Sequence, residues 1–320
     1  MAKTNKKIKW WGVLLISIGS LFALILTVWG AINILKFPIY SEYYSLKQEL
    51  FKIPDIHNNF VPQGIAYADD YDTYLVPGYM SDDTASKIYV VDSDKNVETY
   101  NLSQGDEIFT KHCGGIAITK NNIYIATGSR VYTIDYNQLI ADEDKNIEVG
   151  TGVKVNNSAS FIFSNDNYIY VGEYCDRAVE SYVKDHPYDT PEGNHLSIVT
   201  KYSVNDLNTP LQIISIRDYV QGFAVGDDGR IYLSTSHGLT SSIIYCYDET
   251  SLTKSENTLD GADVYYLTNH FREIHGPAMF EDLDYVDGKL ICSTESACNK
   301  YIFGKFFFGD YAFSLDVTNI

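Results

Sequence analysis

The stretch Lys87-Ile-Tyr-Val-Val-Asp92 consists mainly of strand-forming residues and ends in an aromatic-x-x-Asp pattern. The pattern recurs along the chain in three clear copies and one degenerate copy: Arg130-Val-Tyr-Thr-Ile-Asp135, Ile243-Ile-Tyr-Cys-Tyr-Asp248, Tyr311-Ala-Phe-Ser-Leu-Asp316 and the degenerate Ile198-Val-Thr-Lys-Tyr-Ser203. A strand motif that repeats in this way indicates a protein built from similar sheets, so the repeat decides the fold class.

Each copy follows a short inner strand, a tight turn and a second strand. The predicted inner strands begin about 45 to 62 residues apart. They are Gln63–Tyr67, Gly114–Ile118, Ala159–Phe163, Gln221–Val225 and Glu281–Tyr285. Turns such as Asp228-Gly229 and Asp287-Gly288 favour hairpins. The sequence therefore predicts an all-β fold, a five-bladed β-propeller. A solenoid is the rival, but the variable repeat length argues against it.

The last repeat has no fourth strand, because the chain ends at Ile320 shortly after the third. An unclosed propeller would leave two sheet edges without partners. We therefore expect residues 46–53 to supply the missing strand. If this segment is only a linker, the edge stays unprotected.

The N-terminal region predicts a membrane anchor. Trp10 to Leu35 is a run of 26 residues without charge. A helix of that length spans a hydrocarbon core of about 30 Å. Four lysines and no acidic residue precede it, which favours a cytoplasmic N-terminus. The predicted organisation is a cytoplasmic tail (1–9), a transmembrane signal-anchor (10–35) and an extracellular domain (36–320) of a single-pass cell-membrane protein. A cleaved signal peptide is the rival interpretation.

The charge of the external part restricts its partners. Without the four lysines of the tail, 20 basic and 42 acidic residues remain, a formal charge of −22. Such a surface repels nucleic acid, so no nucleic-acid partner is expected. The five cysteines lack the CxxC spacing of a structural zinc site. Cys113, Cys175 and Cys298 fall near loop ends, and a disulfide among them is left open.

Loops of variable length and the entries of the inner strands are predicted to share one face of the ring, at the mouth of its channel. Loops that vary on a rigid scaffold usually carry binding sites. Polar residues from these positions form the candidate site: Gln63, His112, Gln221 and His237 for ligand binding, and Glu173, Glu281, Asp282 and Glu295 for a metal ion. Carboxylate oxygens are the ligands that Ca²⁺ prefers. The alternative is that these groups hydrate the channel or bond neighbouring backbone.

Four runs of sequence carry a resemblance: Val61–Tyr67, Val220–Val225, Arg230–Ser236 and Met279–Tyr285. Together they resemble a group of uncharacterised bacterial extracytoplasmic propellers. They are also loosely similar to the gluconolactonase and strictosidine-synthase-like propellers. That wider class implies a metal ion in the central channel and, for some members, hydrolysis of lactones. It has six blades where this chain predicts five.

Two functions remain open. The first is a membrane-anchored binding or scaffold propeller that takes a protein, glycan or small ligand at the channel mouth, with Ca²⁺ as a candidate cation. The alternative is a metal-dependent, lactonase-like hydrolase. No GxSxG, P-loop, HExxH or EF-hand motif identifies catalytic residues, so whether the chain is an enzyme is not decided.

Overall fold

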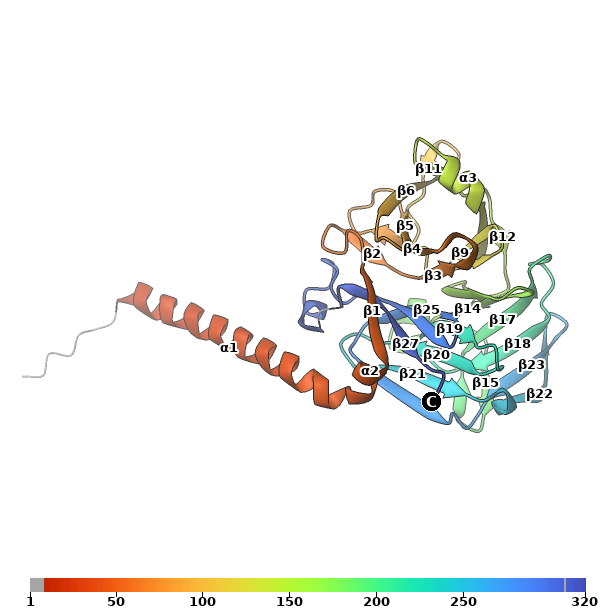
Figure 1. The fold of residues 1–320 in the computed structure, drawn as a ribbon. Coiled ribbons are helices and arrows are strands. Elements are labelled where there is room, and N and C mark those ends of the chain that lie inside the picture. Colours follow the sequence, from red (N-terminus) through yellow and green to blue (C-terminus); the bar gives the residue numbers. More distant parts are fainter. Residues whose placement is uncertain (1–8, 308) are drawn as a thin grey trace, which may run out of the picture.

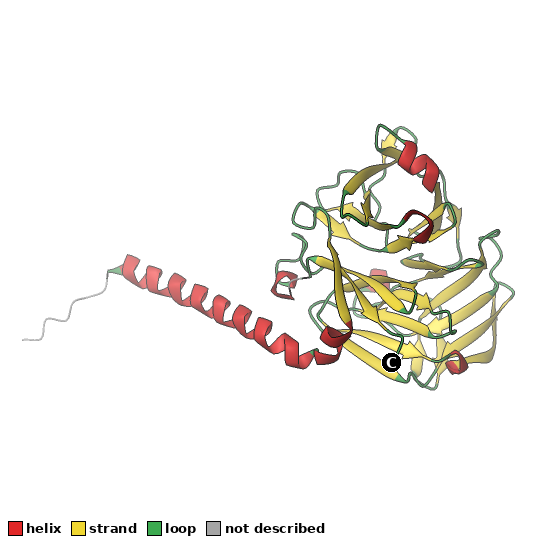
Figure 2. Ribbon diagram, viewed as in Figure 1, coloured by secondary structure: helices red, strands yellow, loops and turns green. Residues whose placement is uncertain are grey.

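The computed structural model describes residues 9–307 and 309–320. Its strands surround a common centre, and one long helix projects away from them (Figure 1). Apart from this helix, helical structure is confined to short segments at the edges (Figure 2). The expected all-β propeller with an N-terminal apolar helix is therefore confirmed as an architecture.

Across the described residues, strand pairing gives five sheets of four or more strands and one hairpin. The first sheet contains β2 (Phe60–Pro62), β3 (Ala66–Ala68), β4 (Thr73–Met80), β5 (Lys87–Asp92), β6 (Val97–Gln104), β7 (Glu107–Ile108) and β11 (Asn146–Glu148). The second contains β8 (Gly115–Thr119), β9 (Asn122–Thr127), β10 (Arg130–Asp135) and β12 (Val153–Lys154). The third contains β13 (Phe161–Ser164), β14 (Tyr168–Gly172), β17 (Ser197–Ser203), β18 (Gln212–Ile216), β23 (Ala262–Leu267) and β22 (Leu252–Leu259).

The fourth sheet contains β19 (Val220–Val225), β20 (Ile231–Thr235), β21 (Ser242–Tyr247) and β24 (Arg272–Gly276). The fifth contains β25 (Phe280–Val286), β26 (Lys289–Thr294), β27 (Tyr311–Asp316) and β1 (Lys47–Lys52). The hairpin pairs β15 (Tyr188–Thr190) with β16 (Gly193–His195). The five sheets are thus less regular than equal four-stranded blades: three have four strands, one has six and one has seven.

The inner strands of the five sheets contact one another in a closed circuit. β3 lies against β8, β8 against β13, β13 against β19, β19 against β25, and β25 against β3. Polar contacts link sheets here as well, because the Tyr67 amide donates to Asp284 Oδ2 at 2.9 Å and Ser164 Oγ donates to the Ile118 carbonyl at 3.0 Å. Large buried aromatic side chains fill the space between sheets, among them Tyr89, Tyr132 and Tyr232.

Close approach of the inner strands depends on glycine. A Cβ atom on Gly115 would lie 2.6 Å from the Ile162 nitrogen and 2.8 Å from the Phe161 Cα. These neighbours are backbone atoms and cannot rotate away. We expect Gly115→Ala to lower the free energy of unfolding by about 3 kcal/mol. Urea denaturation measures this, and Gly30→Ala, which meets no atom within 4 Å, is the matched control. An unchanged midpoint for Gly115→Ala would contradict the packing described here.

The predicted closing strand is confirmed. β1 pairs antiparallel with β27, from Lys47 opposite Leu315 to Lys52 opposite Tyr311, with one irregularity between Glu49 and Phe51. The Ile53 amide continues the contact by donating to the Asp310 carbonyl at 2.9 Å. The segment after the long helix therefore completes the fifth sheet and pairs the first strand of the propeller with its last.

Two insertions extend the outer edges of preceding sheets. β11, which lies between β10 and β12 in sequence, pairs in parallel with β6 of the first sheet. The hairpin β22–β23, inserted between β21 and β24, pairs in parallel with β18 of the third sheet. Each insertion therefore attaches one sheet to the outer strand of its predecessor.

Helix α1 (Trp10–Ile39) has no buried residue and is long and apolar enough to cross a membrane. It extends four residues beyond the predicted span. Helix α2 (Ser41–Leu46) follows directly and is fixed to the propeller. Its Tyr43 is buried against Phe280 and Phe313, and Arg272 Nε pairs with Glu42 Oε1 at 2.5 Å. The remaining helical segments are α3 (Tyr136–Ala141), η1 (Asp69–Tyr71), η2 (Glu180–Tyr182), η3 (Glu249–Ser251) and η4 (Gly304–Phe307).

All five cysteines are free thiols with buried side chains. Burial raises the pKa of the Cys113 thiol to about 12, which disfavours the reactive thiolate. The disulfide left open by the sequence is therefore not formed in this structure.

Candidate ligand site at the channel mouth

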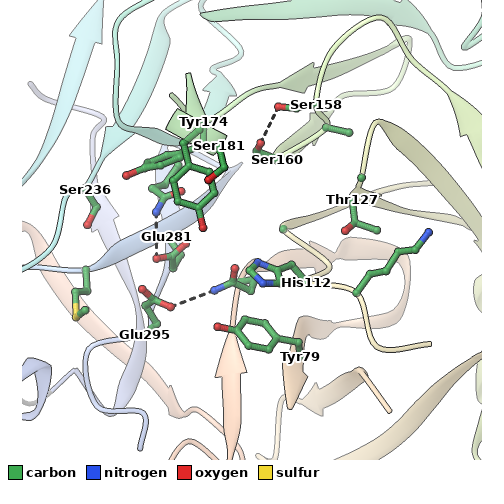
Figure 3. A pocket seen from close by; sticks show the side chains of 18 of the residues that line it. Tyr79, His112, Thr127, Ser158, Ser160, Tyr174, Ser181, Ser236, Glu281 and Glu295 are labelled. Atoms are coloured by element: carbon green, nitrogen blue, oxygen red, sulfur yellow. Dashed lines mark hydrogen bonds between the residues drawn. The ribbon is translucent and has the colours of Figure 1, made fainter. Parts of the chain in front are cut away.

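A cavity of about 610 Å³ lies at the end of the ring where the inner strands begin. Every one of the five sheets contributes to its wall, and Figure 3 shows side chains from all of them facing the same space. The loops between second and third strands lie at this end, as expected from the antiparallel order of the strands. The predicted channel mouth is thus a real cavity.

Two buried glutamates form the polar centre of this cavity. Glu281 is the second residue of β25, and Glu295 follows β26, so the pairing of these two strands brings the side chains together (Figure 3). The two carboxyl groups hydrogen-bond to each other. An amide flanks each of them. Gln63 Nε2 donates to Glu295 Oε2 at 3.2 Å, and Gln221 Nε2 donates to Glu281 Oε1 at 3.5 Å.

The environment of the pair favours one shared proton. Burial raises the pKa of Glu281 well above its ordinary value, and the charge and hydrogen bond of Glu295 raise it further. Burial also raises the pKa of Glu295 to about 7, although hydrogen bonds from Glu281 and Gln63 and the charge of Lys300 oppose this. Because two adjacent buried carboxyls cannot both ionise cheaply, Glu281 holds the proton and donates it to Glu295.

An aromatic and cationic wall faces the glutamates. The rings of Tyr79 and His112 stack with centroids 4.4 Å apart and planes 6° apart. Lys300 Nζ donates to the Tyr79 hydroxyl and lies 4.8 Å from the Tyr79 ring centroid. Burial lowers the pKa of His112, and the charge of Lys300 lowers it further. His112 is therefore a neutral imidazole at neutral pH, able to donate one hydrogen bond and accept another.

Two inserted loops complete the cavity. The loop after β14 contributes Tyr174, Tyr182 and Lys184, and the loop after β26 contributes Lys300 and Tyr301. The sequence predicted loops of variable length on this face, but none of these five side chains was predicted as a ligand contact. Their aromatic and basic character was the only signal in the sequence.

The structure brings together five of the eight predicted site residues. Gln63, His112, Gln221, Glu281 and Glu295 all line the cavity. Glu173, His237 and Asp282 do not line it. Three of the four predicted ligand-binding residues and two of the four predicted metal-binding carboxylates therefore lie in one cavity, and their roles stay predictions.

Glu173 has a different partner. Its Oε2 atom lies 2.7 Å from His186 Nδ1, and its side chain is almost fully buried. Burial would lower the pKa of His186, but the hydrogen bond and the charge of Glu173 raise it overall. The pair therefore holds the loop after β14 as a buried ion pair, a role for His186 that the sequence did not reveal.

Asp282 points into the ring between sheets. Its Oδ2 atom accepts a hydrogen bond of 3.4 Å from the Ile116 amide, and its Oδ1 atom is buried without a protein partner. Burial raises the pKa of Asp282 well above its ordinary value. Asp282 is absent from the cavity lining although Glu281 is part of it, so the two carboxylates do not share one site; the pairing of β25 with β26 is irregular between Phe280 and Leu283.

His237 lies in a separate and more open place. Its Nε2 atom is 3.3 Å from Asp176 Oδ2, and its ring lies 4.4 Å from that of Tyr219. It lines a neighbouring cavity of about 350 Å³ together with Arg217 and Asp218.

The residues present do not fit the predicted cation site. Within residues 9–307 and 309–320, no three His, Cys, Asp or Glu side chains are arranged to hold a metal ion. The N–H groups of Gln63 and Gln221 donate to the two carboxyl groups, so these amides turn donors and not oxygen ligands toward the glutamate pair. We therefore derive no chemistry through a metal.

Comparisons with known proteins find structural neighbours only. No family model matches the sequence, and no curated protein is significantly similar to it. A gluconolactonase from Xanthomonas campestris is 13% identical, with 85% of this chain and 89% of that chain covered and a TM-score of 0.43. The PQQ-bound aldose sugar dehydrogenase of Streptomyces coelicolor is 13% identical (84% and 97% covered, TM-score 0.44). A putative glucose dehydrogenase from Thermus thermophilus is 11% identical (84% and 99% covered, TM-score 0.44).

Gluconolactonase-like and sugar dehydrogenase propellers are therefore among the structures similar to this chain. The sequence resemblance named the gluconolactonase class and did not name the sugar dehydrogenases. At these identities we infer no activity from them, and the propeller assignment rests on the strand pairing described above.

Proposed function

We propose that the protein is a membrane-anchored extracytoplasmic propeller that binds a small polyhydroxylated ligand, of the carbohydrate class, at the channel mouth. The observation that carries this proposal is the proton-sharing pair Glu281–Glu295, flanked by the amides of Gln63 and Gln221. Such a group offers acceptors and donors side by side, which is what adjacent hydroxyl groups of a sugar require.

The walls of the cavity support the same ligand class. Tyr79, Tyr174, Tyr182 and Tyr301 line it, and the Tyr79–His112 stack presents a flat surface. A sugar ring has an apolar face that packs on such a surface, while serine hydroxyls from the third and fourth sheets provide further hydrogen bonds. A volume of about 610 Å³ is sufficient for a small molecule.

The membrane anchoring is supported by α1. The helix is uncharged from Trp10 to Leu35, and lysines precede it. With the tail (1–9) in the cytoplasm, residues 10–35 would cross the membrane and residues 36–320 would lie outside, where a formal charge of −22 keeps the domain soluble. Retention of the full chain in the membrane fraction after alkaline carbonate extraction tests this part alone.

The ligand proposal is tested with the full chain in detergent micelles. Titration calorimetry with neutral sugars, sugar acids and short glycans is expected to find at least one ligand. Gln221→Leu should weaken its binding about tenfold or more, because Glu281 is then left without its amide partner. Gln138→Leu, at an exposed position of α3, is the matched control and should bind as the parent does. Absence of binding to every sugar class, or equal binding by both variants, would contradict the proposal.

A hydrolase is the second candidate, favoured by one observation. Near neutral pH the pair holds one carboxyl as an acid and one as a base, which is the requirement for general acid–base catalysis. A hydrolase of this kind would act through Glu281 and Glu295 and would need no metal ion. A screen of lactones and glycosides with parent and Glu295→Gln proteins tests it.

The metal-dependent, lactonase-like form of that hydrolase makes a separate prediction. Because Glu173 and Asp282 have other partners, we expect neither EDTA nor added Ca²⁺ to change the melting temperature of the full chain. Scanning calorimetry in detergent measures this. A clear loss of stability in EDTA that Ca²⁺ restores would reinstate the cation site and the lactonase alternative.

A further inference from the structure

The loop after β26 exposes two consecutive large apolar residues. Ile302 is 72% exposed and Phe303 is 66% exposed. Among the described residues after α1, no other large hydrophobic side chain is as exposed as either of them. Two adjacent exposed apolar side chains on a surface with a strongly acidic formal charge require a partner or an apolar phase.

The position of this loop indicates that the apolar surroundings are those of a lipid bilayer. Segment η4, directly after Phe303, contacts helix α1. In Figure 1 the loop lies on the side of the propeller from which α1 projects. Phe37 and Phe307 line one cavity between the end of the helix and the fifth sheet. Ile302 and Phe303 therefore lie next to the end of α1 that joins the propeller.

The attachment of α1 to the propeller is firm enough to fix this relation. Tyr43 of α2 is buried between Phe280 and Phe313, and the Tyr40 hydroxyl lies 2.8 Å from Ser241 Oγ. The helix therefore does not continue into a free linker. Wherever α1 enters the bilayer, the loop after β26 is held close to the same surface.

One lysine near the apolar pair is available to the bilayer surface. Lys305 lies two positions after Phe303, and its ammonium group donates to the Asn299 side chain, whereas the Lys300 ammonium group is held in the cavity by the Tyr79 hydroxyl. Apolar and aromatic side chains with lysine neighbours are typical of segments at the interface between lipid and water, because the ammonium groups reach the phosphates while the apolar groups enter the acyl region.

We propose that Ile302 and Phe303 insert into the outer surface of the same bilayer that α1 crosses, as a second membrane contact of the propeller. The inference rests on the membrane anchoring proposed above. It has a consequence for the site, because Lys300 and Tyr301 line the channel-mouth cavity and the next two residues contact lipid. The mouth therefore opens beside the membrane surface, within reach of ligands carried by the membrane.

The test uses the full chain reconstituted into vesicles of phosphatidylethanolamine and phosphatidylglycerol. Phe303→Cys and, separately, Ile302→Cys are labelled with the fluorophore NBD; the native cysteines are buried and react slowly. The matched control is Leu211→Cys, which is 47% exposed. Leu211 lies between β17 and β18, at the end of the third sheet opposite the cavity, where the Val204 amide bonds the turn at Asn167.

Lipids that carry a nitroxide on the acyl chain are expected to quench the label at position 303 several-fold more than the label at position 211. Equal, weak quenching at both positions in protein that floats with the vesicles would overturn the inference and leave the anchoring intact. A blue-shifted label that lipid does not quench would overturn it in favour of a protein partner. Protein that fails to float with the vesicles would overturn the anchoring, and this inference with it.

Discussion

A chain that begins at residue 54 is expected not to fold. It lacks β1, so β27 loses its partner and the fifth sheet becomes an open edge. Two deeply buried side chains, Phe51 and Ile53, are lost at the same time. Since native domains are stable by only about 5–15 kcal/mol, loss of a core strand removes most or all of the free energy of unfolding. Circular dichroism during urea denaturation should show no cooperative transition.

A chain that begins at residue 40 is the control, because it lacks α1 but keeps α2 and β1. It is expected to unfold cooperatively, with a midpoint near that of the full chain. If the chain from residue 54 shows the same transition as the chain from residue 40, the pairing of β1 with β27 is not needed for a stable propeller, and the prediction is wrong.

Raising the pH from 5 to 8 is expected to destabilise the full chain by several kcal/mol. The pKa of Glu295 is about 7 in the folded protein and has an ordinary value of 4.5. A carboxyl whose pKa is raised by folding stabilises the fold fully below its unfolded pKa, and that stabilisation is lost as the pH rises through the folded pKa. For Glu295 alone the difference corresponds to about 3 kcal/mol. Asp284, whose pKa burial raises to about 6, acts in the same direction.

Replacement of the titrating group isolates this effect. Glu295→Gln keeps the shape of the side chain but has no proton to lose, so its free energy of unfolding should fall less between pH 5 and pH 8. Glu143→Gln, at an exposed position of the loop before β11, should follow the parent. Urea denaturation in detergent at several pH values measures the three curves. A parent stability that increases over this range would show that the glutamate pair is not buried as described.

The periodic part of the fold could be predicted from the sequence, and the rest could not. The third strands at Lys87–Asp92, Arg130–Asp135 and Tyr311–Asp316 coincide with β5, β10 and β27, because alternation and the terminal aspartate are local signals. The closing strand could be predicted because the last repeat has only three strands and residues 46–53 were available to supply the fourth. The parallel pairing of β11 with β6 and of β23 with β18 has no local signal, since a short strand does not specify which distant edge it will join.

The candidate site shows the same division. Gln63, Gln221 and Glu281 were placed by their position at the entries of inner strands, which is fixed by the repeat. Glu173 was misplaced because its partner His186 lies in an insertion without periodicity. Asp282 was grouped with Glu281 because the irregular pairing of β25 between Phe280 and Leu283 has no signal in the sequence. Lys300 was missed because its position depends on the path of an irregular loop.

The parallel additions on the outer strands have a consequence for a protein held at high density on a surface. β6 and β18 would otherwise present free backbone donors and acceptors to neighbouring molecules, which is the usual route to edge-to-edge aggregation. β11 and the β22–β23 hairpin cover these strands, so β11 and β22 become the outer edges instead. β11 has only three residues, and β22 carries exposed Lys254 and Glu256 and is irregular between Lys254 and Thr258. Short, charged and irregular edges disfavour strand addition, so the insertions replace two regular edges with two that neighbouring copies pair with poorly.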